Sequence, residues 1–225
     1  MSWAIELFHN GGYLMYVNLV VLVFALAVIS ERAFMLFARF RVNTKAFLLE
    51  IEKALGAGNM PKAVKMCKEE EQKGKLLPKM VLVATNSFQL GTIEAWERAI
   101  DESKAELVPL ITKRLGMLWP LANIATLVGL VGTVFGLIEA FSAVGAVSAE
   151  QKALLLTKGI SHAMNNTAWG LSIALVITLA HMILNNYMKG LADDLELASH
   201  RMINILAKHH MAERAKAAAA GQQQA

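Results

Sequence analysis

The stretch "LVGLVGTVFGLIEAF" (Leu127–Phe141) decides the fold class of this 225-residue chain. Thirteen of its fifteen residues are apolar or glycine, and the exceptions are Thr133 and Glu139. Small and hydroxyl residues recur every three or four positions, so they share one narrow face of a helix. They are Gly129, Gly132, Thr133 and Gly136. Such a face predicts close packing against another helix in lipid. In the simplest alternative, Thr133 bonds only a carbonyl one turn back.

The composition is that of a helical membrane protein. Hydrophobic residues make up 56% of the chain and charged residues 18%. Three stretches lack charge for about the 20 residues that a helix needs to cross a bilayer. We therefore predict an all-α protein with transmembrane helices at 13–30, 115–143 and 159–188. The remaining predicted segments are a short N-terminus (1–12), a helical domain (31–114), a loop (144–158) and a C-terminal helix with a flexible tail (189–225).

The distribution of Lys and Arg predicts the orientation in the membrane. Fifteen of the twenty-two lie between residues 31 and 118, and five follow residue 188. By the positive-inside rule, these two segments face the cytoplasm. The N-terminus and the 144–158 loop are then periplasmic.

The pattern between the first two spans is helical. The first span is predicted to continue as one helix as far as Gly56, because no breaker interrupts it. Asn59 followed by Pro61 predicts the start of the next helix. Pro109 and Pro120 predict a kinked path into the second span. The polar segment after residue 188 is predicted to continue the third helix.

The third span carries a stripe of small and polar residues. Its members are Ala163, Asn166, Thr167, Gly170, Ala174, Thr178, His181 and Asn185, spaced by three or four residues. Polar groups in a bilayer face a bundle interior or water, because lipid offers them no partner. The stripe should therefore face a partner helix or an aqueous path, and the candidate residues for an ion path are Thr133, Thr167, Asn166, Thr178 and His181. Hydrogen bonding between helices, without transport, would produce the same stripe.

Three further polar residues are predicted near the outer side of the membrane: Glu139, His162 and Asn165. Glu139 and His162 could share a level, but at about 100° per residue each lies over 100° from the face of its threonine. They are therefore candidates for a subunit contact. Glu139 could also extend to water from a helix end.

No enzyme motif is present, so neither catalytic nor metal-binding residues nor a cofactor are predicted. The chain lacks a phosphate-binding lysine loop, an HExxH pair and a G-x-S-x-G elbow. The single Cys67 excludes an internal disulfide and a cysteine metal cluster. A net charge of +4 gives no reason to expect a nucleic-acid partner.

The motifs resemble the MotA/TolQ/ExbB ion-channel family, and its ExbB/TolQ branch in particular. "GLVGTVFGLIEAF" (Gly129–Phe141) and "GISHAMNNTAWGLSIAL" (Gly159–Leu175) are similar to the two signature spans of that branch. The E-R pair at Glu31-Arg32 with its following basic helix is similar to the stretch that leaves the first span. Three spans with one large cytoplasmic segment fit this branch better than the four-span MotA layout.

The resemblance implies a motor or stator subunit of the bacterial inner membrane. Five copies would surround the single transmembrane helices of two ExbD/TolR-like partners, each carrying an aspartate that binds and releases the ion. Thr133 and Thr167 match the threonines that line the path, and the glycines of the second span would leave room for a central helix. The load could be TonB-like import, Tol-like envelope maintenance or gliding motility.

Three departures from the family pattern concern the ion. His162 stands where the family usually has a glutamate, and Val176 stands where it commonly has a proline. The two residues before Thr167 are the amides Asn165 and Asn166. We predict H⁺ as the transported ion, although the extra amides are compatible with Na⁺.

Two other functions are open at this point. A membrane scaffold that conducts nothing would share the fold, but it has no need of the polar stripe. A small secondary transporter should show two similar halves, and the sequence shows none.

Overall fold

The structure, a computed structural model, describes residues 13–40, 43–145 and 148–222. The predicted N-terminal segment 1–12 and the last three residues of the predicted tail lie outside these ranges. All regular structure in the described residues is helical. The chain divides into a membrane unit (Met1–Arg32 and Arg114–Asn185) and a polar unit (Ala33–Lys113 and Asn186–Ala225).

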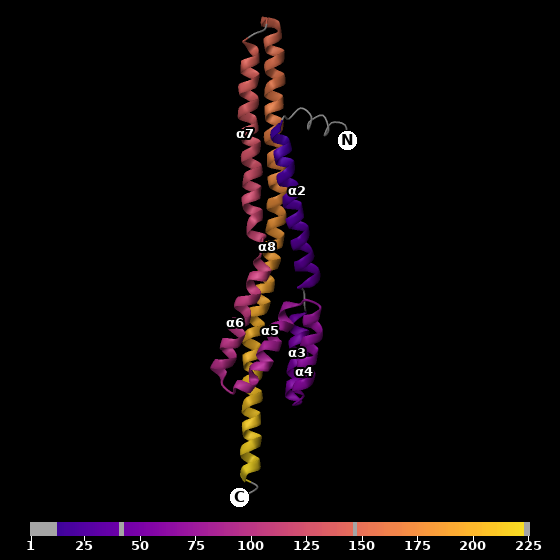
Figure 1. Cartoon of the computed structure of the whole chain (residues 1–225), viewed down its shortest axis with the longest axis vertical. Helices are drawn as coiled ribbons and strands as arrows, with labels where there is room; N and C mark the ends of the chain where they lie inside the picture. The colour runs from indigo at the N-terminus through magenta and orange to yellow at the C-terminus, as the bar shows by residue number, and fades with distance from the viewer. Residues whose placement is uncertain (1–12, 41–42, 146–147, 223–225) are drawn as a thin grey trace. The chain divides into compact units, whose positions relative to one another are not determined.

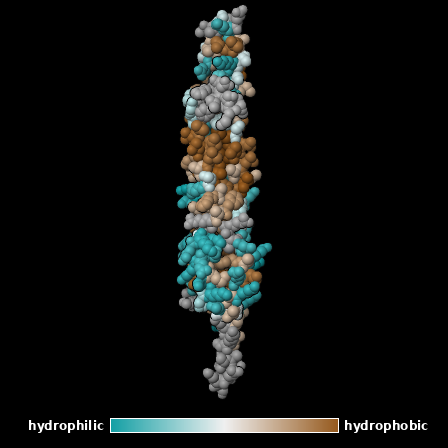
Figure 2. Space-filling view, turned by 90° about the vertical axis from the view of Figure 1, so that its right-hand side faces the viewer, coloured by the Kyte–Doolittle hydropathy of each residue, from teal (hydrophilic) through white to brown (hydrophobic). Residues whose placement is uncertain are grey.

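The membrane unit contains α2 (Tyr13–Phe34, up to Arg32), α7 (Leu118–Val144) and α8 (Ala149–Gln222, up to Asn185), which lie side by side in Figure 1. Three of the described helices are long and apolar enough to cross a membrane, which agrees with the predicted class. Large apolar side chains such as Val20, Leu127 and Leu175 stay exposed on them. Figure 2 shows hydrophobic side chains gathered in a band over this unit. Exposed apolar surface of this extent is what lipid or another subunit covers.

The connection between α7 and α8 is shorter than predicted. We expected a loop over 144–158, but helix α8 already begins at Ala149. The segment "AEQKALLLTK" consists largely of strong helix formers, which explains why it extends the helix instead of forming a loop. The prediction that the third helix continues past the span is confirmed, since α8 runs for 74 residues to Gln222.

The polar unit contains α3 (Thr44–Gly56), α4 (Met60–Gln72), α5 (Leu76–Asn86) and α6 (Ile93–Thr112). Asn59 starts α4 as predicted, because its side chain accepts a hydrogen bond from the Lys62 amide at 3.2 Å. The core of the unit includes the fully buried Trp96 and Ile100.

The single thiol of the chain is also buried in the polar unit. Cys67 has no exposed surface, and burial together with the nearby Glu71 carboxylate raises its pKa to about 12. A thiol held in this state is a poor nucleophile, because the thiolate is the reactive form.

The prediction of one helix from the first span to Gly56 is wrong. Helix α2 ends at Phe34, a π-helical turn covers Met35–Arg39, and α3 begins at Thr44. The Asn43 side chain accepts a hydrogen bond from the Ala46 amide at 3.2 Å. An asparagine cap of this kind starts a new helix, and the apolar periodicity of the sequence did not reveal it.

The predicted kink before the second span is a full break between helices. Helix α6 contains Pro109 and ends at Thr112, and Arg114 then has a left-handed backbone with φ 61°. A short 3₁₀ turn, Leu115–Met117, precedes α7. Pro120 lies in the first turn of α7, where its missing N–H breaks no helical hydrogen bond.

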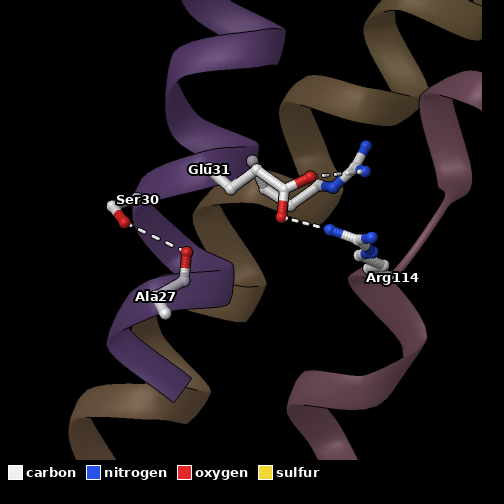
Figure 3. A network of polar contacts seen from close by, with 5 residues as sticks. Ala27, Ser30, Glu31 and Arg114 are labelled. Carbon is white, nitrogen blue, oxygen red and sulfur yellow. Dashed lines mark hydrogen bonds and ion pairs between the residues drawn. The ribbon is translucent and has the colours of Figure 1, made fainter. Parts of the chain in front are cut away.

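Within the membrane unit, an ion pair links α2 to Arg114, the residue just before the 3₁₀ turn. The Arg114 guanidinium donates to Glu31, and Arg32 donates to the other oxygen of the same carboxylate at 3.3 Å (Figure 3). Arg32 is 2% exposed, so its charge is compensated within the protein. A buried charge requires such a partner.

Candidate ion path in the membrane unit

The three glycines of α7 let α8 approach closely. A methyl group added at Gly129 would lie 3.0 Å from the main-chain oxygen of Asn166. At Gly132 it would lie 2.8 Å from Asn166 Cβ, and at Gly136 it would lie 2.9 Å from Ala163 Cβ. The room that these glycines were expected to leave for a partner's helix is therefore filled by α8 of the same chain.

Gly170 makes the matching approach from α8. A methyl group there would lie 2.7 Å from the main-chain oxygen of Ala125 and 2.9 Å from Gly129 Cα. Ala174, one turn further on, is buried. Small residues thus face each other across the contact between α7 and α8, as close packing in lipid requires.

The hydroxyls of Thr133 and Thr167 meet in this contact. The two Oγ atoms form a hydrogen bond in which either can donate. The main-chain oxygen of Gly129 lies 3.2 Å from both hydroxyls, and that of Ala163 lies 3.3 Å from the Thr133 hydroxyl. Two hydroxyls and two carbonyl oxygens therefore converge at one half-buried point between the helices.

Two asparagines bury amide groups near the same contact. Asn166 is 8% exposed and packs against Gly132, and its Oδ1 has no hydrogen-bond partner among the described residues. Asn18 of α2 is 2% exposed, and its Oδ1 likewise finds no partner in the described part of the chain. The Asn18 Nδ2 lies 3.2 Å from where a Gly170 methyl would be. We did not predict Asn18, although a lone amide in an apolar span is itself a signal of a polar contact.

Two of the three predicted outer-side residues line one cavity of about 310 Å³. Glu139 of α7 and His162 of α8 both line it, together with Gly132, Gly136 and Asn166. Asn165 is half-buried but does not line this cavity. The structure thus brings Glu139 and His162 together, and it also connects them to the helix face that carries the glycines.

Thr178 and His181 lie further along α8 and are half-buried. At about 1.5 Å per residue, Thr178 is roughly 16 Å along the helix from Thr167. These two residues therefore continue the stripe but do not join the hydroxyl cluster. Among the described residues, no three His, Cys, Asp or Glu side chains are placed to hold a metal ion.

Converging hydroxyl and carbonyl oxygens can serve an ion in two ways. They can replace part of a cation's hydration shell, as oxygen ligands do in channels. They can also relay a proton, because a hydroxyl both donates and accepts hydrogen bonds. Both uses need polar groups inside a membrane helix pair, where such groups are otherwise unfavourable.

The fold and this cluster define a helical membrane protein in which hydroxyl and carbonyl oxygens converge, half-buried, between two of its spans. Residues 71–197 match the sequence pattern of the MotA/TolQ/ExbB proton channel family. The chain belongs to this family, which is one of channels and not of enzymes. The matched region contains both Thr133 and Thr167.

A similarity search also finds a relative in Methanothermobacter thermautotrophicus. It is provisionally named biopolymer transport protein ExbB homolog and is 26% identical over 191 residues. The match covers 85% of this chain and 64% of the relative, so the chain spans less than two thirds of that protein.

Proposed function

We propose that the chain is an ion-conducting motor subunit of the ExbB/TolQ type, which uses the proton motive force to do work on the cell envelope. The observation that carries this proposal is the contact between the Thr133 and Thr167 hydroxyls at the packed face of α7 and α8. Membership of a proton channel family and similarity to a protein named for ExbB support it.

In the proposed assembly, five copies surround a pore that holds the single spans of two ExbD/TolR-like partners. The exposed apolar faces of α2, α7 and α8 supply the surfaces for lipid and for neighbouring subunits. An aspartate on each partner helix would exchange its proton beside the threonine cluster. No soluble cofactor is needed, since H⁺ itself is the substrate.

The proposed location is the bacterial inner membrane, with the N-terminus in the periplasm and the polar unit in the cytoplasm. Basic residues at the inner end of the spans support this orientation by the positive-inside rule. Arg32 and Arg114 both lie at that end. The load could be TonB-like import, Tol-like envelope maintenance or gliding.

The decisive experiment removes one hydroxyl. Thr167→Val deletes the Oγ that bonds both Thr133 and the Gly129 oxygen. The matched control is Thr157→Val, since the Thr157 hydroxyl is exposed and bonds only the carbonyl of Ala153 among the described residues. Both variants should assemble with the partner, and only Thr167→Val should abolish proton flux in proteoliposomes.

A non-conducting scaffold is the second candidate, because the same hydroxyls satisfy each other and so could serve packing alone. A scaffold predicts that Thr167→Val supports wild-type envelope function in cells. Full activity of that variant would refute the motor proposal. Flux that requires Na⁺ and persists without a proton gradient would refute H⁺ as the ion.

A further inference from the structure

We infer that the cavity lined by Glu139 and His162 is a water-filled proton-entry site that serves the Thr133–Thr167 pair from the outer side of the membrane. The inference rests on the proposed function, because a proton-entry site has a use only in a chain that carries protons. It assigns the carboxylate of this site to Glu139 of α7, while α8 contributes His162 at the position where the family usually has a glutamate.

The cavity has the size and the groups that proton uptake needs. A volume of about 310 Å³ has room for roughly ten waters at about 30 Å³ each. Its titratable lining groups are Tyr13 of α2, Glu139 of α7, and Lys158 and His162 of α8. A carboxylate and an imidazole both exchange protons at moderate pH.

The charges around the cavity favour a proton over a metal cation. The Lys158 ammonium lines the same space as the Glu139 carboxylate, so the cavity has little net negative charge. The ammonium repels Na⁺ and hydronium alike, but a proton can bind covalently to the Glu139 carboxylate and cross as an O–H bond, whereas Na⁺ keeps its charge throughout the cavity.

Neither threonine lines the cavity, and the wall that Asn166 and Ala163 contribute lies between it and the hydroxyl pair. Asn166 is 8% exposed and lines the cavity, and its Oδ1 has no partner among the described residues. A buried amide oxygen without a donor costs about 1–3 kcal/mol. The Asn166 Oδ1 is closed to solvent, so a cavity water donates to it only once the amide turns toward the cavity that the residue lines. Ala163 lies on the same wall, and its main-chain oxygen is 3.3 Å from the Thr133 hydroxyl.

The proton steps balance with water and the aspartate of the proposed partner helix. A hydronium ion protonates the Glu139 carboxylate and becomes water. The carboxyl passes this proton through a cavity water to the neutral His162 ring and returns to the carboxylate. The imidazolium then releases a proton to the water beside Asn166. That water, now carrying the proton, donates it to the Thr133 hydroxyl, whose own proton passes to Thr167. The Thr167 hydroxyl in turn gives its proton to the aspartate of the proposed partner helix.

Thiol labelling tests whether water reaches the inner end of the cavity. Cys67 is buried and its pKa is raised to about 12, so the native thiol should not react and only the introduced cysteines should be labelled. Asn166→Cys and His162→Cys are treated from the outside with a charged methanethiosulfonate reagent. Lys152→Cys, at an exposed site on α8, is the positive control, and Ile177→Cys, at a buried site, is the negative control.

Asn166→Cys should react at least about tenfold faster than Ile177→Cys, because thiol reactivity follows exposure to water. Labelling as slow as that of Ile177→Cys, while Lys152→Cys reacts normally, would show a dry cavity and overturn the inference.

Proton flux tests the chemistry in the full complex with its single-span partner. Glu139→Gln with His162→Gln should lower flux by roughly tenfold or more, as loss of proton-transfer groups does. Lys152→Gln is the matched control. Wild-type flux in the double variant would refute the inference and leave the proposed function standing. Absence of flux in the wild-type complex would refute the proposed function, and the inference with it.

Discussion

Gly170→Ala should weaken the packing of α8 on α7 in the membrane unit. The added methyl would lie 2.7 Å from the Ala125 oxygen and 2.9 Å from Gly129 Cα. Contacts to carbon favour about 3.5–4.0 Å, and both neighbours are backbone atoms. The two helices must therefore move apart locally, and the hydroxyl pair beside Gly129 should loosen with them.

The loss of stability caused by Gly170→Ala can be separated from the change in helix propensity by comparison with Gly190→Ala on the same helix. A methyl at Gly190 meets nothing within 4 Å, so this variant shows only the gain of about 0.8–1 kcal/mol from replacing glycine in a helix. Both variants share that gain. Their difference therefore isolates the cost of overpacking, which is about 1–3 kcal/mol.

Unfolding of the purified protein by sodium dodecyl sulfate in mixed micelles, followed by circular dichroism, measures this difference. Gly170→Ala should unfold at a lower detergent fraction than wild type, and Gly190→Ala at the same or a higher fraction. If Gly170→Ala proved as stable as Gly190→Ala, the close approach of α7 and α8 at this point would be refuted.

Three predictions concern the polar unit. Cys67 should stay unmodified by iodoacetamide at pH 8 while the denatured chain reacts fully, because its pKa is about 12; mass spectrometry of the folded protein checks this, and rapid alkylation would contradict it. Asn43→Ala should lower the stability of the unit by about 0.5–2 kcal/mol through loss of the cap on α3, as measured by thermal unfolding; an unchanged midpoint would show that the cap is not needed. The hydrogen bond from Lys104, at 2.7 Å, lowers the pKa of Glu196, so the stability that this pair contributes is present above the ordinary glutamate pKa and is lost as the pH falls through the lowered one. Glu196→Gln should reduce the loss of unfolding free energy at acid pH by less than about 1 kcal/mol, since Glu196 is half exposed. If the unfolding free energy of this variant fell with pH as it does in wild type, the pair would contribute nothing to stability.

The spans and the two stripes of small and polar residues were predictable because both follow from periodicity within one helix, whereas the direct contact between Thr133 and Thr167 was not predicted. Thr133 and Thr167 lie on stripes of small residues, and two such stripes pack on each other. The start of α4 was equally local, since Asn59 and Pro61 are a known pair of start signals.

The features that were missed depend on contacts between helices or on a single capping bond. A helical wheel gives the angle of a residue around the axis of its own helix. By that angle, Glu139 and His162 both lie away from the face that carries the threonine. The cavity that they share forms between α7, α8 and α2, and no wheel of one helix contains it. The break before α3 depends on one hydrogen bond from Asn43, which periodicity does not register.

Thr133 and Thr167 have only two hydroxyl protons between them, but more than two acceptors are in reach. These are each other's hydroxyl oxygens and the main-chain oxygens of Gly129 and Ala163. If Thr133 donates to Thr167, then Thr167 donates to Gly129; if the order reverses, Thr133 donates to a carbonyl instead. The pair thus has two orientations of opposite sense, as water molecules have in ice, and switching between them turns two O–H bonds without moving a helix. In the proposed motor, each proton that passed would leave the chain of bonds pointing the other way, so the pair would have to turn back before it accepted the next one.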